Sequence, residues 1–183
     1  MSAPRIVGLS GHLTLPSRTL WLTQHIVDRV AAATGGEGQV YSVMDDPAGL
    51  GQTLERKLAP PKLEAALRDI ETCDVLVAVT PVYKGGYAGL FKHMIDLLDM
   101  KVLAGRPVIV AATGYSERHA CVVDYLMRPL FAFFGAQVMN AGVFAGKTDI
   151  GEQYQLAPAL EAAIDSAVRQ AAHSLGTSQC EAN

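Results

Sequence analysis

The sequence predicts an α/β protein in which helices cover both faces of a doubly wound, five-stranded parallel sheet. Five short runs rich in β-branched and other apolar residues alternate with long helical patterns, as in strand–helix–strand units. The run from Cys73 to Thr80 is almost continuously apolar, which is typical of a strand buried on both faces. The 183 residues contain no internal repeat or linker, so we expect one domain over residues 1–183.

In the first half of the chain, particular residues mark the ends of the helices. Ser17 begins a helix whose apolar residues fall on one stripe, and the pair Gly35 and Gly36 ends it. Pro61 favours the start of the next helix, and the polar residues 47–60 before it form a loop with room for a short helix. We therefore expect strands at residues 5–9 and 39–44 and helices at residues 17–33 and 61–71.

The second half repeats the alternation. Strands are expected at residues 73–80, 107–113 and 136–144, and helices at residues 89–100, 117–134 and 157–175. Within the helix at 117–134, residues 121–134 are apolar on nearly every face except at Asp124 and Arg128, a pattern typical of buried helices. Because an outer helix of a small monomer leaves one face uncovered, we expect it to form a subunit interface together with the helix from Gly89 to Met100. Pro129 removes one helical hydrogen bond, so the turn before it should be distorted.

Composition argues against several classes of protein. Hydrophobic residues make up 50% of the chain, which argues against disorder, and no run of about 20 apolar residues is free of charges, Pro or Gly, so we expect no membrane span. The net charge of −3 is not the basic footprint of a nucleic-acid-binding protein. The N-terminus lacks a secretory pattern, and Cys73, Cys121 and Cys180 lack metal-ligand spacing, so we expect a cytoplasmic protein with free thiols and no metal.

Ligands of doubly wound sheets bind beyond the carboxyl ends of the strands, which are followed here by three notable loops. The first loop, residues 10–19, leads into a helix N-terminus, where free N–H groups favour an anion. Ser17 and Thr19 add hydroxyls, and Arg18 adds a permanent charge. Phosphate binding and simple capping of the helix by Ser17 are equally supported. The dinucleotide-binding pattern GxGxxG is absent.

The loop after the third strand, residues 80–89, combines Pro81, three glycines and two tyrosines. Glycines let a backbone approach a flat ligand closely, and tyrosines supply aromatic surface and hydroxyls. We therefore favour a binding loop over a tight turn packed on its neighbours. The loop after the fourth strand, residues 113–116, has one glycine and one tyrosine, so it is a weaker candidate of the same kind.

Two further patterns carry less weight. The segment AGVFAGKT at residues 141–148 is similar to a phosphate-binding P-loop, but it follows the last strand and continues into a polar stretch instead of a helix. We therefore reject a P-loop. His119 is interpreted as a residue at the start of a helix rather than as a proton donor, because nothing nearby in the sequence would tune its pKa.

Three segments together carry a family resemblance. They are the first loop with PSRT at residues 16–19, the stretch TPVYKGGYAGLFKHMIDLLD from residue 80, and the turn ATG at residues 112–114. These segments resemble the NAD(P)H-dependent FMN reductases, in particular the reductase partner of two-component alkanesulfonate monooxygenases. Residues 123–129 and the GVF at residues 142–144 extend the resemblance over about residues 5–150.

The resemblance implies a flavodoxin-like fold with strand order 2-1-3-4-5, homodimers or homotetramers, and FMN with NADPH or NADH as ligands. It implies hydride transfer between two bound ligands without a catalytic side chain. Reduced FMN would pass to a flavin-dependent monooxygenase in sulfonate or organosulfur utilisation. The residues implied to bind the flavin are Gly11, His12, Ser17, Arg18, Thr19, Pro81, Val82, Tyr83, Lys84, Thr113, Gly114 and Ser116.

Three residues qualify what the resemblance implies. Many members carry an arginine in the first loop where this chain has Thr14, so Arg18 would hold the phosphate with hydroxyls and backbone alone. Lys84 is either a contact to the flavin or a solvated surface lysine. The family carries an inserted tyrosine in a π-bulge, and Tyr125 matches that position, which implies a place at the subunit interface near the flavin.

Two other activities fit the same sequence. One is a flavodoxin-type electron carrier that retains FMN, and the other is an FMN-dependent quinone or azo-dye reductase. Carriers tend to be strongly acidic, and a net charge of −3 is mild, which favours the reductase. Retention of flavin through gel filtration would favour either alternative.

Overall fold

A computed structural model describes residues 3–181, with side chains as far as residue 176, so residues 1–2 and the side chain of Cys180 lie outside the described part. The sheet has the order β2-β1-β3-β5-β6, which confirms the predicted order 2-1-3-4-5, and β7 also pairs with β5. These strands, all parallel, are β1 (Arg5–Ser10), β2 (Glu37–Ser42), β3 (Val75–Tyr83), β5 (Pro107–Thr113), β6 (Gln137–Val138) and β7 (Val143–Ala145). A short β4 (Gly86–Tyr87) forms an antiparallel hairpin with β3.

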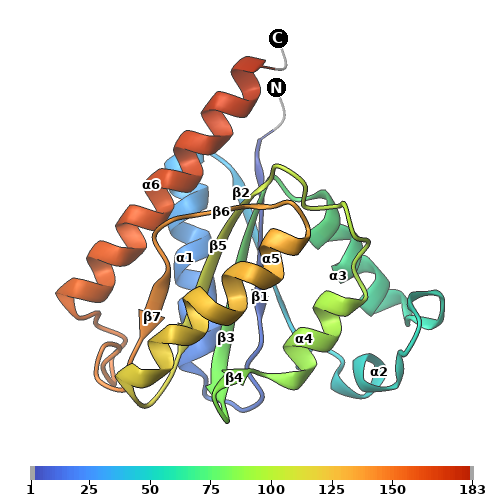
Figure 1. Cartoon of the computed structure of the whole chain (residues 1–183), viewed down its shortest axis with the longest axis horizontal. Helices are drawn as coiled ribbons and strands as arrows, with labels where there is room; N and C mark the ends of the chain where they lie inside the picture. Colours follow the sequence, from blue (N-terminus) through green and yellow to red (C-terminus); the bar gives the residue numbers. More distant parts are fainter. Residues whose placement is uncertain (1–2, 182–183) are drawn as a thin grey trace.

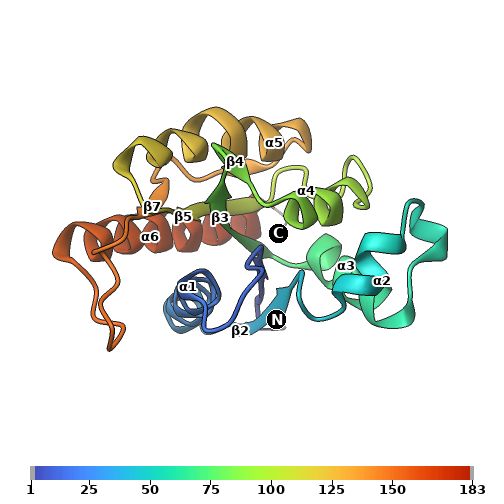
Figure 2. The same ribbon diagram turned by 90° about the horizontal axis from the view of Figure 1, so that it is seen from below.

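Helices cover both faces of the sheet (Figure 1, Figure 2). One face carries α1 (Arg18–Thr34) and α6 (Pro158–Glu181), which lie side by side over an apolar core. The other face carries α3 (Pro61–Thr72), α4 (Gly89–Asp96) and α5 (Arg128–Phe133) over a second core. The predicted loop after β2 contains α2 (Pro47–Gln52) and a 3-10 turn, η1 (Arg56–Leu58).

The first helix begins and ends close to where the sequence predicts. Ser17 is its N-cap, because the Ser17 hydroxyl oxygen accepts a hydrogen bond from the Leu20 N–H at 3.1 Å. Gly35 ends it in the left-handed conformation, with φ of 65°. Gly8 lets the helix lie close to β1, since a Cβ there would lie 2.7 Å from Val27. The N-terminus of α1 is thereby held at the carboxyl edge of the sheet.

The last predicted strand, at residues 136–144, is divided into β6 and β7. Between them, the Arg128 guanidinium donates hydrogen bonds to the carbonyl oxygens of Met139 and Asn140, at 2.7 and 2.5 Å. These contacts to a distant helix replace strand pairing, so the prediction of one continuous strand was wrong.

The single helix predicted at residues 117–134 is also divided. It consists of a 3-10 turn, η2 (Glu117–Ala120), a π-helical segment, η3 (Val123–Met127), and α5. Pro129 has no N–H to donate to the carbonyl of Tyr125, four residues earlier, which confirms the predicted distortion. Tyr125 lies in the π-helical segment, as the resemblance implied. In the single chain, the side chains of Tyr125 and Phe133 are 77% and 67% exposed.

Candidate functional site

A cleft of about 480 Å³ opens at the carboxyl edge of the sheet, the edge that Figure 2 views from below. Residues at or just after the carboxyl ends of four strands, β1, β3, β5 and β7, contribute to its walls. The volume lies within the range of roughly 300–1,000 Å³ that is usual for small-molecule sites. The lining residues are His12, Leu13, Thr14, Pro16, Ser17, Arg18, Thr19, Pro81, Val82, Tyr83, Thr113, Gly114, Tyr115, Ala145, Gly146, Lys147 and Ile150.

Most of the residues predicted to bind a ligand line this cleft. The exceptions are Gly11, Lys84 and Ser116. Gly11 instead packs under α4, since a Cβ there would lie 2.9 Å from the Cβ of Phe91. The Ser116 hydroxyl caps the 3-10 turn η2 by accepting a hydrogen bond from the Arg118 N–H at 3.4 Å.

Lys84 and Gly85 form the tip of the β3–β4 hairpin. Both have positive φ, 51° and 81°, the combination that a type I′ turn requires at its two central positions. Gly85 is therefore required by the turn. The sequence had instead suggested that the glycines of this loop let the backbone approach a ligand. A Cβ at Gly86 would meet only Leu126, at 3.8 Å. The glycine-rich loop thus shapes a hairpin beside the π-helical segment, and the cleft is lined by Pro81, Val82 and Tyr83, on the β3 side of that hairpin.

One end of the cleft, here called the basic end, consists of Ser17, Arg18, Thr19 and Lys147. Ser17 caps α1 through its oxygen lone pair, so its hydroxyl proton is still able to donate to a ligand. An Arg18 guanidinium nitrogen, Nη1, donates a hydrogen bond to the backbone carbonyl of Lys147 at 2.8 Å. This bond joins the first loop to the loop after β7. The basic end presents hydroxyl donors and cations at the N-terminus of a 17-residue helix.

A second part of the lining, here called the aromatic end, consists of Pro81, Val82, Tyr83 and Tyr115. The tyrosines are 44% and 82% exposed, so their rings are available for contact with a planar ligand. Pro81 pairs in register with Thr113 across β3 and β5, which brings the two loops together. The aromatic end thus offers apolar surface with few charges.

A short contact connects the two ends. The hydroxyl oxygens of Thr19 and Thr113 lie 2.7 Å apart and share a hydrogen bond between the start of α1 and the end of β5. Thr19 is 4% exposed, so this bond satisfies a buried group. The relative position of the two ends therefore depends partly on one pair of hydroxyls.

His12 lines the cleft, but its side chain is mostly buried and contacts neighbouring hydroxyls. Its side chain is 3% exposed, and Nδ1 lies 3.1 Å from the Ser10 hydroxyl and 3.2 Å from the Ser42 hydroxyl. Burial lowers the pKa of His12 below its usual value, although Asp45 opposes this. The imidazole is therefore mainly neutral at pH 7 and adds no full charge to the site.

His119 lies behind the Thr113–Gly114 turn, within the 3-10 turn η2, as the sequence analysis expected. A Cβ at Gly114 would lie 2.8 Å from His119 Nδ1, so the glycine permits this packing. His119 Nδ1 is buried and has no hydrogen-bond partner among the described residues. The side chain does not line the cleft.

Sequence reasoning missed the contribution of the loop after β7. Ala145, Gly146, Lys147 and Ile150 line the cleft because β7 pairs with β5, with Ala145 opposite Thr113. The GVF at residues 142–144 was the available signal, since it marks a strand end at the same edge. Leu13, Thr14, Pro16 and Tyr115 lie within loops that had already been singled out.

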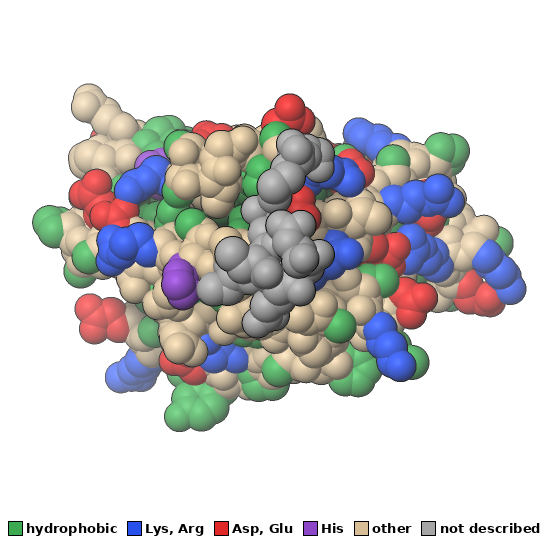
Figure 3. Space-filling model, turned by 90° about the horizontal axis from the view of Figure 1, so that it is seen from above, with side chains coloured by type: hydrophobic (Ala, Val, Ile, Leu, Met, Phe, Trp, Pro, Cys, Tyr) green, Lys and Arg blue, Asp and Glu red, His purple; other side chains and the backbone are tan. Residues whose placement is uncertain are grey.

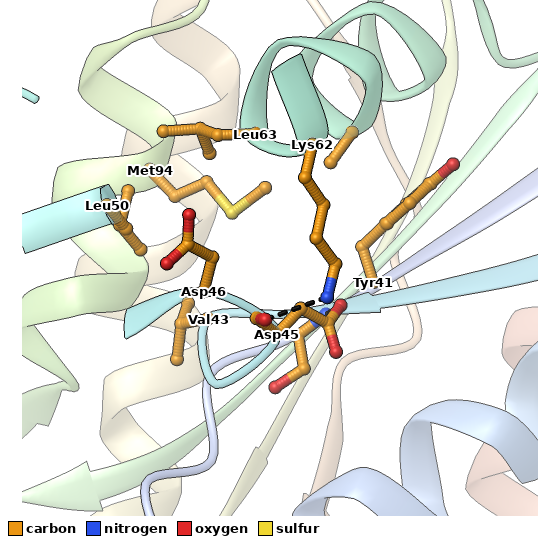
Figure 4. Close-up of a pocket in the computed structure, with 10 residues that line it drawn as sticks. Tyr41, Val43, Asp45, Asp46, Leu50, Lys62, Leu63 and Met94 are labelled. Atoms are coloured by element: carbon orange, nitrogen blue, oxygen red, sulfur yellow. Dashed lines mark hydrogen bonds between the residues drawn. The ribbon is translucent and has the colours of Figure 1, made fainter. Parts of the chain in front are cut away.

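Two other cavities differ from this cleft. A groove of about 600 Å³ lies on the other side of the first loop and includes Asp45, Trp21 and Tyr154. The cavity in Figure 4 lies between β2, α3 and α4 and has a volume of only about 20 Å³, room for about one water molecule. There the Lys62 ammonium donates a hydrogen bond to the backbone carbonyl of Asp45 at 2.8 Å.

Within the described residues, no group of three or more His, Cys, Asp or Glu side chains is placed to hold a metal ion. None of the described helices combines the length and apolar character needed to cross a bilayer.

Comparison with known proteins points to one family. The model of the family described as NADPH-dependent FMN reductase matches residues 4–150. The FMN reductase (NADPH) of Pseudomonas aeruginosa is 41% identical over 96% of this chain and 95% of its own length. The NADH-dependent FMN reductase SfnF of Pseudomonas fluorescens is 42% identical over 97% of this chain and 95% of its own length.

A solved structure of an FMN oxidoreductase has a similar fold. The apo form of the NADH:FMN oxidoreductase EMOB has a TM-score of 0.85 and 28% sequence identity, over 94% of this chain and 90% of that one.

Proposed function

The chain belongs to the NADPH-dependent FMN reductase family, and we propose that it reduces FMN with NADPH or NADH in the cleft described above. The observation that carries the proposal is the polarity of the cleft. Cations and hydroxyls gather at the basic end, and aromatic and apolar side chains at the aromatic end. FMN has the same division between a phosphate and a flat ring, so the residues fit this group.

We assign the phosphate of FMN to the basic end, with Ser17, Arg18 and Thr19 as its donors. The ring is assigned to the aromatic end, against Pro81, Val82 and Tyr83 and the turn at Thr113 and Gly114. His12 would contact the flavin as a neutral group. Gly11, Lys84 and Ser116 have no direct contact in this assignment, because they do not line the cleft.

The chain's own contribution to the reaction is binding and orientation. FMN, when bound, supplies the ring that accepts hydride from the nicotinamide, and that transfer requires no general acid or base from the protein. The basic end fixes one end of the flavin, and the aromatic end holds the ring plane. The open aromatic end, with Tyr115 82% exposed, leaves room for a second planar ligand to enter.

We propose further that reduced FMN leaves the protein for a flavin-dependent monooxygenase in sulfonate or organosulfur utilisation. The resemblance of the first loop and of the stretch from residue 80 to the reductase partner of alkanesulfonate monooxygenases supports this. A cytoplasmic location is part of the same proposal, since the ligands and the sparse cysteines suit a reducing compartment.

Multiple turnover tests the proposed activity. Purified protein with excess NADPH or NADH and added free FMN should oxidise many equivalents of the nicotinamide per chain, with oxygen consumed by the FMN that is released. The protein should lose its flavin on gel filtration. Protein that stays yellow and turns over only once would point to the electron carrier, and turnover that depends on quinone or azo dye with retained flavin would point to the third activity.

We also propose a homodimer or homotetramer that assembles through α4, η3 and α5. Tyr125, Leu126 and Phe133 are exposed in the single chain and lie on the layer that also carries α4 (Figure 2). Exposed large apolar side chains gathered on one layer are typical of interfaces between subunits. The proposed π-helical interface would bring Tyr125 near the flavin through the neighbouring β3–β4 hairpin.

Replacing Tyr125 with alanine should shift the protein toward a smaller assembly in sedimentation velocity or change its retention of flavin. Leu54→Ala is a matched control, since Leu54 is 80% exposed but lies on the loop after α2. The assembly proposal fails if the Tyr125 variant keeps its oligomeric state, flavin affinity and turnover.

A further inference from the structure

The loop after β7 brings a lysine to the basic end of the cleft. Lys147 belongs to the AGVFAGKT segment, which was rejected as a P-loop, and the structure agrees that no helix follows it until α6 begins at Pro158. The segment nevertheless reaches the edge of the sheet where the first loop lies. It does so because β7 pairs with β5, with Ala145 opposite Thr113.

The backbone around Lys147 is fixed from two sides. The Arg18 guanidinium donates a hydrogen bond to the Lys147 carbonyl at 2.8 Å, across 129 positions of sequence. The Gly146 N–H donates to the Asp149 carboxylate, also at 2.8 Å, which holds the turn. Lys147 is exposed and lines the cleft, and no carboxylate forms an ion pair with Lys147 or Arg18 in the part of the chain that the structure describes.

The charge of the cleft differs from that of other surfaces. The chain has 18 acidic and 15 basic residues, yet no Asp or Glu among the described residues lines the cleft. The groove on the other side of the first loop includes Asp45. On the face that Figure 3 shows, acidic and basic side chains are interspersed. The charged side chains that line the cleft are thus the two cations, Arg18 and Lys147.

We infer that Lys147 is a second cation for the terminal phosphate of FMN and makes the site selective for a flavin that ends in a phosphate monoester. The inference rests on the proposed function. A phosphate monoester carries a charge of about −1.5 to −2 at pH 7. Arg18 and the N-terminus of α1 supply about +1.5 together, and Lys147 adds one further positive charge, which offsets the Asp149 carboxylate held on the Gly146 N–H. The first loop has no other cation, because position 14 is a threonine.

The test compares Lys147→Met with Lys57→Met. Lys57 is an exposed lysine on η1, outside the cleft, so its variant loses the same charge without touching the lining. Dissociation constants for FMN and for riboflavin, which lacks the phosphate, are measured by quenching of flavin fluorescence. Lys147→Met should weaken FMN binding roughly fivefold, the size of effect expected for an exposed ion pair, and leave riboflavin binding unchanged. Lys57→Met should change neither, and Lys147→Arg should restore FMN binding.

Two results would overturn the inference. FMN affinity within twofold of wild type in Lys147→Met would show that the lysine does not contact the phosphate. Equal losses for FMN and riboflavin would show a structural role.

Steady-state kinetics separate this inference from the proposed function. A wild-type protein that fails to reduce FMN contradicts the proposed function itself. A wild type that reduces FMN, with a Lys147→Met variant whose KM for FMN is unchanged, contradicts only the role of Lys147. The expected result is a raised KM for FMN with kcat near that of wild type.

Discussion

The basic end of the cleft joins segments 129 positions apart in the sequence, whereas the aromatic end is made by residues of one hairpin and one turn. The basic end is positioned by the cap of α1 and by the Arg18 hydrogen bond to Lys147. The aromatic end is positioned by the pairing of β3 with β5 and by the turn at Lys84 and Gly85. The comparison teaches that the basic end depends on one side-chain hydrogen bond between loops, while the surface for a ring follows from the pairing of strands and a hairpin turn.

The largest effect on flavin binding is expected at the basic end. Arg18→Ala removes a charged donor and also frees the loop that carries Lys147. A charged hydrogen bond contributes about 1.5–3 kcal/mol, so FMN should bind roughly ten- to a hundredfold more weakly. Riboflavin should bind as before, which equilibrium titration of both flavins will show. Similar losses for the two flavins would mean that the ends of the cleft are not separate.

A smaller effect, without selectivity between flavins, is expected at the aromatic end. Tyr83→Ala removes a ring whose contact with a planar ligand contributes about 0.5–1.5 kcal/mol, or roughly two- to tenfold in affinity. FMN and riboflavin should lose affinity by the same factor in the same titration. Tyr83→Phe keeps the ring and serves as the control. A loss confined to FMN would show that Tyr83 contacts the phosphate and not the ring, which contradicts our assignment.

The smallest effect on flavin affinity is expected where the two ends meet. Thr113→Val removes the hydroxyl that shares a hydrogen bond with buried Thr19 and keeps the side chain's shape. The free energy of unfolding should fall by about 1 kcal/mol, measured by urea denaturation, while the affinity for either flavin changes by about twofold or less. Thr113→Ser retains the hydroxyl and should unfold like wild type. An unchanged stability in Thr113→Val would show that the ends are held together by the sheet alone.

Local signals in the sequence accounted for the fold and for most of the cleft. Ser17 and Gly35 predicted the ends of α1 because caps act within one turn of chain. Pro129 predicted the distortion before α5 for the same reason. The strand order followed from the family resemblance, and the comparisons confirm the family and its FMN reductase activity.

Other features depended on contacts between distant residues. The break in the last strand comes from Arg128, which lies on α5, and the place of Lys147 comes from the pairing of β7 with β5. No pattern along the chain contains these contacts. The role of Gly85 was ambiguous for a different reason, because a tight turn and a close ligand both favour glycine. Only the backbone, with φ of 81° at Gly85, distinguishes the two roles.

The division of the last strand also affects how the protein behaves in concentrated solution. A continuous edge strand presents a row of free N–H and C=O groups that can recruit a strand from another molecule and start aggregation. Here the β6 and β7 pieces have only two and three residues, and Arg128 occupies the carbonyls of Met139 and Asn140 between them. A foreign strand therefore finds no long ladder to extend at this edge, and the sheet is protected against open-ended growth on this side.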